Sequence, residues 1–142
     1  MRLLLLLPLT MLLACGAPAD DLGAEPGADT LAGGGAISQP ENDLQISIDR
    51  GDGVAPESYT LVCAGNVEGT HPRAEQACAH LAGLEAPFAP IPDDAMCTQQ
   101  YGGPETATVT GRWAGEPVEV ALSRTDGCRI SQWASLGPLL EA

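Results

Sequence analysis

The sequence contains no lysine, few aromatic residues and no apolar run long enough to cross a membrane. Its cations are six arginines, against 19 carboxylates in 142 residues, so the net charge is −13 at pH 7. A chain with this balance cannot displace the counterions of a polyanion, which excludes nucleic acid and acidic lipid surfaces as partners. The length also excludes a barrel or a doubly wound enzyme with a cofactor cleft, so we expect one domain plus processed or unstructured segments.

The first 14 residues have the pattern of a signal peptide. Arg2 precedes an apolar run over residues 3–13, which as a helix spans about 16 Å and is too short for a hydrocarbon core of about 30 Å. The run ends in the letters LLAC, which resemble the bacterial lipobox, in which the cysteine is lipidated and becomes the mature N-terminus. We therefore predict a lipoprotein signal peptide over residues 1–14 and lipid on Cys15. An ordinary secretory signal with an incidental cysteine is the alternative.

Residues 15–43 are predicted to form a disordered tether. After Cys15 this segment has six glycines, three prolines and six carboxylates, with no arginine and no aromatic residue. So little apolar surface cannot offset the entropy of ordering, and the like charges repel one another. The protein is therefore expected outside the cytoplasm, as a cell-surface lipoprotein or in secreted form, with a folded domain over residues 44–142.

Alternating apolar residues in that domain predict four strands, at 44–48, 58–63, 106–113 and 118–122. Ala114-Gly115 between the last two strands predicts a hairpin turn. Strands and helices that segregate along the chain indicate an α+β domain built on one antiparallel sheet.

Two helices are expected to cover this sheet. Pro72 suits the first position of a helix that stops at Gly83, and Asp126 is expected to cap a second, shorter helix. The apolar positions of the first helix are Ala74, Ala77, Cys78 and Leu81, and those of the second are Ile130, Trp133 and Ala134.

The five cysteines suggest a division of roles. If Cys15 carries lipid, four cysteines remain. An even number of cysteines in an exported chain indicates two disulfides. Spacing alone leaves three pairings open. Because Cys63 faces the core from a strand and Cys78 faces it from a helix, we favour a Cys63–Cys78 bridge, which leaves Cys97 for Cys128.

We find no set of residues that predicts an enzyme. His71, Asp126 and a serine could form a triad on paper, but almost any chain supplies such ingredients. Cys63, His71 and Cys78 could be imagined around zinc, yet disulfides are favoured for an exported chain without a C-x-x-C pair. No glycine-rich loop joins a strand to a helix. We therefore expect no catalytic residue, no cofactor and no metal.

Residues 96–104, with the sequence MCTQQYGGP, form an irregular segment that is fixed at Cys97 and ends in a Gly-Gly-Pro turn. An exposed, extended and covalently fixed loop is what a protease inhibitor needs, because it can add as a strand to the cleft of an enzyme. Rigidity reduces the entropy lost on docking. The alternative is a surface connection that the disulfide fixes only for stability.

Several motifs resemble the Streptomyces subtilisin inhibitor family over about residues 44–142. They are YTLVC ending at Cys63, GTHP ending at Pro72, AC at Cys78, MCTQQY from Met96 and GRW ending at Trp113, followed by SRTDGC ending at Cys128.

The resemblance implies a two-layer sandwich of a five-stranded antiparallel sheet and two helices, usually a homodimer formed through the sheets. It also implies the bridges Cys63–Cys78 and Cys97–Cys128. The function that it implies is tight, substrate-like inhibition of subtilisin-type serine proteases.

Carried over to this sequence, the resemblance places the reactive bond between Gln99 (P1) and Gln100 (P1′). Met96, Cys97, Thr98 and Tyr101 would then contact the protease. Two departures from the family pattern are Gln99, where an apolar or basic residue is common, and the lipid anchor. They leave a second hypothesis, in which the same scaffold is a non-inhibitory extracytoplasmic binding module.

Overall fold

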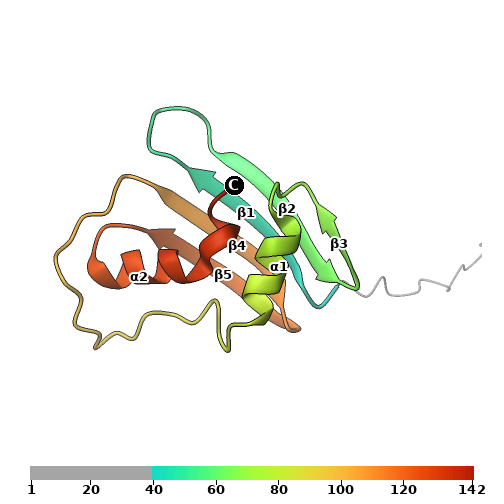
Figure 1. Ribbon diagram of the computed structural model, residues 1–142. Helices are drawn as coiled ribbons and strands as arrows, with labels where there is room; N and C mark the ends of the chain where they lie inside the picture. The colour runs from blue at the N-terminus through green and yellow to red at the C-terminus, as the bar shows by residue number, and fades with distance from the viewer. Residues whose placement is uncertain (1–39) are drawn as a thin grey trace, which may run out of the picture. The chain divides into compact units, whose positions relative to one another are not determined.

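The computed structural model describes residues 40–142, in which five strands form one antiparallel sheet in the order β3-β2-β1-β4-β5 (Figure 1). The predicted signal peptide, Cys15 and most of the predicted tether lie outside the described residues. In chain order the elements are β1 (Asp43–Asp49), β2 (Glu57–Ala64), β3 (Asn66–Gly69), α1 (Ala74–Ala82), β4 (Thr106–Trp113), β5 (Glu116–Ser123) and α2 (Gly127–Leu136).

Both helices pack on the same face of the sheet (Figure 1). The central strand β1 pairs with β2 and β4, so that Ile46 lies between Tyr59 and Val109. Side chains alternate between the two faces of a strand, and one face of β1 is buried beneath the helices while the other carries polar groups. The α+β class, the two layers and the five-stranded antiparallel sheet are thus confirmed. The buried core consists of Leu44, Ile46, Ile48, Leu61, Ala77, Cys78, Leu81, Ala107, Val109, Val118, Leu122, Leu136, Leu139 and Leu140.

The edge strand β3 is the one strand that the residue pattern did not predict. It has four residues, all exposed, so no alternation of burial marks it in the sequence. Gly69, with φ of +126°, ends the strand, and a Cβ there would lie 2.2 Å from the carbonyl oxygen of Thr60. This close approach requires glycine, because any side chain would collide with the neighbouring strand.

The helix α1 begins later than predicted, because Pro72 lies in a turn before it rather than at its first position. The cause is His71, whose ring Nδ1 accepts the N–H of Arg73 at 3.1 Å and whose carbonyl accepts the N–H of Ala74 at 3.2 Å. These bonds form a separate turn before the helix. The predicted stop at Gly83 and the predicted apolar face of α1 are confirmed.

The helix α2 is capped as predicted, since the Asp126 carboxylate accepts the N–H of Arg129 at 3.0 Å. The prediction that Ala134 is buried is wrong, because Ala134 is exposed. It lies about 100° round the helix from Trp133, whereas Leu136 continues the face that packs on the core.

Residues just before β1 already make specific hydrogen bonds with the folded domain. The Asn42 side chain donates to the Cys63 carbonyl at 3.1 Å and accepts the N–H of Ala114 at 2.6 Å. Asn42 and Asp43, at the end of the predicted tether, therefore belong to the folded part. Among residues 40–142, no helix has the length and apolarity needed to cross a membrane.

Candidate functional site

The 96–104 loop lies in the long connection between α1 and β4, which has no helix or strand and passes the start of α2 (Figure 1). Met96 is 98% exposed and Tyr101 is 70% exposed. Thr98, Gln99 and Gln100 are exposed as well, whereas Cys97 is half-buried. The residues that the sequence predicted as a contact surface therefore lie together at the surface.

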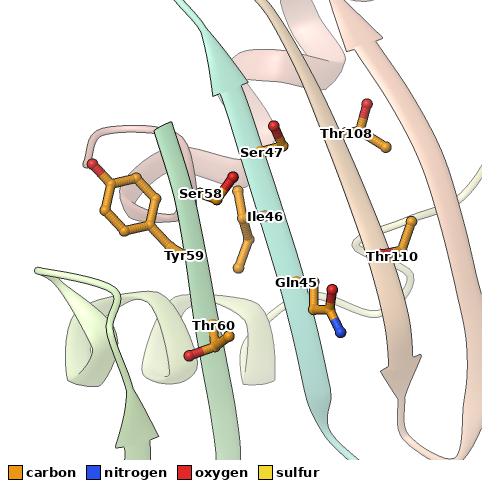
Figure 2. A pocket seen from close by; sticks show the side chains of 8 residues that line it. All are labelled: Gln45, Ile46, Ser47, Ser58, Tyr59, Thr60, Thr108 and Thr110. Carbon is orange, nitrogen blue, oxygen red and sulfur yellow. The ribbon is translucent and has the colours of Figure 1, made fainter. Parts of the chain in front are cut away.

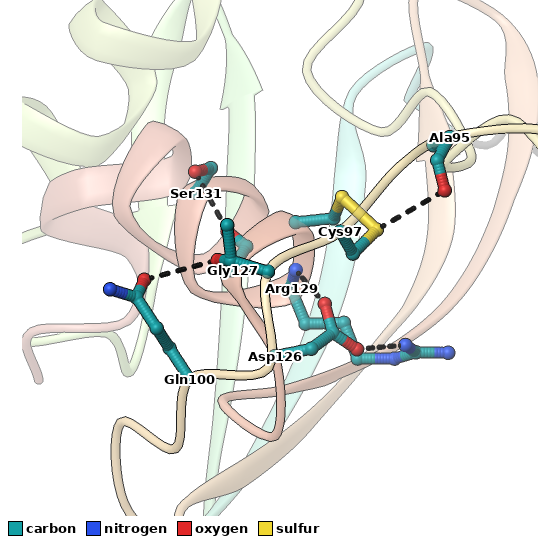
Figure 3. The surroundings of a disulfide bond; sticks show 9 residues. Ala95, Cys97, Gln100, Asp126, Gly127, Arg129 and Ser131 are labelled. Atoms are coloured by element: carbon teal, nitrogen blue, oxygen red, sulfur yellow. Dashed lines mark hydrogen bonds and ion pairs between the residues drawn. A yellow bond between two sulfur atoms is a disulfide. The ribbon is translucent and has the colours of Figure 1, made fainter.

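Two disulfides hold the described part of the chain together. Cys97 is bonded to Cys128 in the first turn of α2, with their Cα atoms 5.1 Å apart. Cys63 of β2 is bonded to Cys78 of α1, with their Cα atoms 5.6 Å apart. Both predicted pairings are confirmed, and the first one fixes the start of the loop to a helix (Figure 3).

A second set of contacts holds the loop directly before Gln99. The Thr98 carbonyl oxygen accepts the N–H of Gly127 at 2.9 Å and the N–H of Gln100 at 2.9 Å. A Cβ on Gly127 would lie 2.0 Å from the Thr98 hydroxyl oxygen, so a side chain there would have to displace this hydroxyl. The sequence predicts an extended segment, and the bond from the N–H of Gln100 to the Thr98 carbonyl adds a local bend at Gln99.

The side chains on either side of Gln99 also contact each other. The Thr98 hydroxyl lies 3.2 Å from the side-chain oxygen of Gln100, to which it donates. Gln99 therefore occupies the tip of a small turn that is closed by both backbone and side-chain hydrogen bonds, and its own side chain remains exposed.

The other end of the loop is held without a covalent bond. The N–H of Gly102 donates to the carbonyl of Arg124 at 2.7 Å. A Cβ on Gly102 would lie 2.9 Å from Cγ1 of Ile130, so the backbone rests directly on α2. The loop is thus fixed before Gln99 and after Tyr101, with the exposed residues between the two points.

A shallow groove of about 500 Å³ adjoins the first half of the loop. Met96 and Thr98 of the loop and Ser131 of α2 are among the residues that line it. Asp93 and Asp94, which precede Met96, are exposed. The surface around the start of the loop is therefore hollowed and acidic.

The pKa of Asp126, next to Gly127, is held below its ordinary value of 3.8, first because the carboxylate accepts the N–H of Arg129. The Arg129 side chain adds a second contact with the same carboxylate (Figure 3). Asp126 therefore keeps its charge, and with it the cap of α2 beneath the loop, to a more acidic pH than a free aspartate would.

His71 has a structural role. Its ring is 4% exposed, and its Nδ1 accepts the N–H of Arg73 while its Nε2 lies 3.0 Å from the carbonyl oxygen of Leu139. The acceptor at Nδ1 assigns the proton to Nε2, which donates to that oxygen. Both nitrogens are occupied, so the imagined triad is wrong.

The imagined zinc site is wrong as well, since its two sulfur atoms form the Cys63–Cys78 disulfide. Within residues 40–142, one group of metal-ligand residue types lies close together, namely Cys97, Asp126 and Cys128. Its two sulfur atoms form the other disulfide, and a disulfide sulfur is not the thiolate that a metal ion needs.

The outer face of the sheet is polar and open. A groove of about 200 Å³ crosses β1, β2 and β4 there, on the side away from the helices (Figure 2). The residues that line it are Gln45, Ile46, Ser47, Ser58, Tyr59, Thr60, Thr108 and Thr110.

The domain is a small two-layer sandwich, and both ring nitrogens of its buried histidine are hydrogen-bonded. Its exposed feature is the fixed loop, which is typical of a protein that binds another protein through its surface. The model of the subtilisin inhibitor-like family matches residues 41–124, more than half of the chain. This chain belongs to the subtilisin inhibitor-like family, and the prediction that it is not an enzyme is confirmed.

Individual relatives are similar over most of the folded part. A subtilisin inhibitor from Streptomyces violaceus is 34% identical over 104 residues, which cover 71% of this chain and 64% of the relative. Plasminostreptin from Streptomyces antifibrinolyticus is 40% identical over 78 residues, which cover 53% of this chain and 71% of the relative. The crystal structure of Streptomyces caespitosus sermetstatin in complex with Bacillus licheniformis subtilisin shares 25% identity with a TM-score of 0.44, over 68% of this chain and 94% of sermetstatin.

Proposed function

We propose that this protein inhibits serine proteases of the subtilisin type by presenting residues 96–101 as a substrate, with Gln99–Gln100 as the reactive bond. The names of its relatives as subtilisin inhibitors support this function. The observation that carries it is the fixing of an exposed Gln99 between the Cys97–Cys128 disulfide and the Gly102 hydrogen bond.

Rigidity gives this loop the properties of an inhibitor. An exposed segment can dock in a protease cleft through main-chain hydrogen bonds, and little entropy is lost if its residues are already ordered. The long, uncharged side chain of Gln99 would enter a broad S1 pocket, and the 98% exposed Met96 would fill an apolar S4 pocket. Gln99 offers no cation to an acidic S1 pocket, so weak inhibition of trypsin is expected.

The test is a titration of subtilisin with oxidised protein that carries Cys15→Ser, so that no lipid is attached. Cleavage of a small chromogenic peptide should fall to near zero at one equivalent, and mass spectrometry should find any nick between Gln99 and Gln100. No inhibition of subtilisin-like or trypsin-like proteases would contradict the proposal. Capture of an extracytoplasmic partner that is not a protease would then favour the binding-module hypothesis, which the unusual Gln99 motivates.

We also propose that Cys15 is lipidated and retains the inhibitor at the cell surface, as the LLAC letters suggest. Two or more acyl chains give stable anchoring, because each buried CH₂ contributes about 0.8 kcal/mol. The bacterial host should carry the protein in its membrane fraction, and Cys15→Ser should release it into the medium. Release of the unchanged protein would contradict lipidation.

A homodimer through the outer face of the sheet is the third part of the proposal. Small polar side chains such as Ser47, Thr60 and Thr108 line the groove on that face, so a second sheet could approach closely. Sedimentation of the lipid-free protein should give twice the monomer mass, and Thr108→Arg should halve it. A monomeric wild type would contradict this part alone.

A further inference from the structure

The two halves of the loop are held in different ways. Up to Gln99 the chain is fixed by the Cys97–Cys128 disulfide and by the bond between the Thr98 carbonyl and Gly127. From Gln100 onward the loop is held by weaker contacts, among them the hydrogen bond from Gly102 to the Arg124 carbonyl. If the reactive bond is cut, no disulfide fixes the new end at Gln100, which stays connected only through the chain that continues into β4.

The side chain of Glu105 connects these weaker contacts. Its Oε1 accepts a hydrogen bond from the Arg124 guanidinium at 3.0 Å, and the two side chains are 27% and 31% exposed, respectively. Arg124 is the residue whose carbonyl holds Gly102. The ion pair therefore fixes the residue that holds the second half of the loop.

The other carboxylate oxygen of Glu105 lies against the loop itself. A Cβ on Gly103, where φ is +142°, would lie 2.0 Å from Oε2, so the carboxylate sits directly beneath the backbone. Oε2 is buried and has no hydrogen-bond partner among residues 40–142. A buried carboxylate oxygen without a partner is costly, and a contribution to function would explain its presence.

We propose that Glu105 is a positioning residue that keeps the second half of the loop in place after cleavage, so that the inhibitor is rejoined rather than consumed. This inference rests on the proposed inhibition at Gln99–Gln100. It concerns the lifetime of the complex and not the first encounter with the protease.

The chemistry makes this lifetime depend on Gln100. Attack by the protease serine forms an ester at the Gln99 carbonyl carbon, and the serine proton passes to the Gln100 nitrogen, which leaves as an amine. Attack of that amine on the ester restores the peptide bond and the serine hydroxyl. Attack by water instead gives the Gln99 carboxylate and consumes the inhibitor. The ratio of rejoining to hydrolysis depends on how closely the Gln100 amine is held to the ester.

The experiment compares wild type with Glu105→Gln, which keeps the size of the side chain and removes its charge. Glu75→Gln is the matched control, because Glu75 is exposed on α1, which packs against β2 and β3 on the face opposite to the proposed dimer interface. Each lipid-free protein is mixed with subtilisin at one equivalent, and the return of protease activity is followed together with the amount of cleaved inhibitor.

We expect Glu105→Gln to bind at first like wild type but to be consumed about tenfold faster, as for the loss of one charge-assisted contact. Arg124→Gln should act similarly, and the double variant should be no faster than either single one, because the two residues act as a pair. Amide exchange at Gly102 in the free protein should also quicken. Thermal unfolding of each variant shows that the protein remains folded.

Equal consumption of wild type and Glu105→Gln, with unchanged exchange at Gly102, would overturn the role of Glu105 while inhibition itself stands. A Glu75→Gln variant that is consumed as fast as Glu105→Gln would also overturn it. A wild type that does not inhibit any of the proteases would refute both the proposed function and this inference.

Discussion

Opening the Cys97–Cys128 disulfide should weaken inhibition strongly, whereas opening Cys63–Cys78 should leave inhibition by the folded protein nearly unchanged, although the two losses of stability are similar. The bridges close loops of 31 and 15 residues. In the chain-entropy model their removal costs about 3.7 and about 3 kcal/mol, so the two losses of stability are similar. The two double Cys→Ser variants are therefore matched in stability but differ in which part of the molecule they release.

The two double Cys→Ser variants should differ in their affinity for the protease. Without Cys97–Cys128, roughly three residues before Gln99 must be ordered again on docking, and each costs about 1–2 kcal/mol of backbone entropy. Since about 1.4 kcal/mol is a tenfold change in affinity, the inhibition constant should rise at least about a hundredfold. The bridge between β2 and α1 does not touch the loop, so the folded fraction of the other variant should inhibit within about threefold of wild type.

The assay is inhibition of subtilisin at low temperature, with urea unfolding of each variant to give the folded fraction. Equal inhibition by the two folded variants would refute the argument that covalent fixing of the loop creates the activity. If the Cys97–Cys128 variant does not fold, Gly127→Ala gives the same test through the other contact of Thr98.

Three further results are expected. Gln99→Lys should shift inhibition from subtilisin toward trypsin, because a cation would then meet the S1 carboxylate; an unchanged profile in a protease panel would move the reactive bond elsewhere. Gly127→Ala should weaken inhibition about tenfold, since its Cβ would lie 2.0 Å from the Thr98 hydroxyl and must displace the group that donates to Gln100; titration at matched folded fraction checks this. The pKa of Asp126 is lowered by its bond to Arg129, so its charged form contributes stability above the ordinary value of 3.8 that is lost as the pH falls through the lower folded value. Urea unfolding should therefore show Asp126→Asn to be less stable than wild type at neutral pH and equal to it in strong acid, and a difference that persists in acid would contradict this.

Local patterns predicted most of the elements because the determining interactions are short-range. The alternation from Leu44 to Ile48 requires only that one face of the strand be buried. Asp126 caps α2 through a bond to a residue three positions away. The strand β3 and the start of α1 were missed, because β3 buries no residue and His71 forms a separate turn that keeps Pro72 outside the helix.

The sequence by itself determined that an exposed polar segment would be fixed by a disulfide at Cys97, and the resemblance placed the bond to test at Gln99. Only the tertiary structure decided what supports that segment. Gly127, Arg124 and Glu105 act through backbone atoms or a single ion pair. Backbone donors and acceptors are the same in every residue except proline, so no side-chain pattern can reveal which of them will meet after the helix has packed on the sheet.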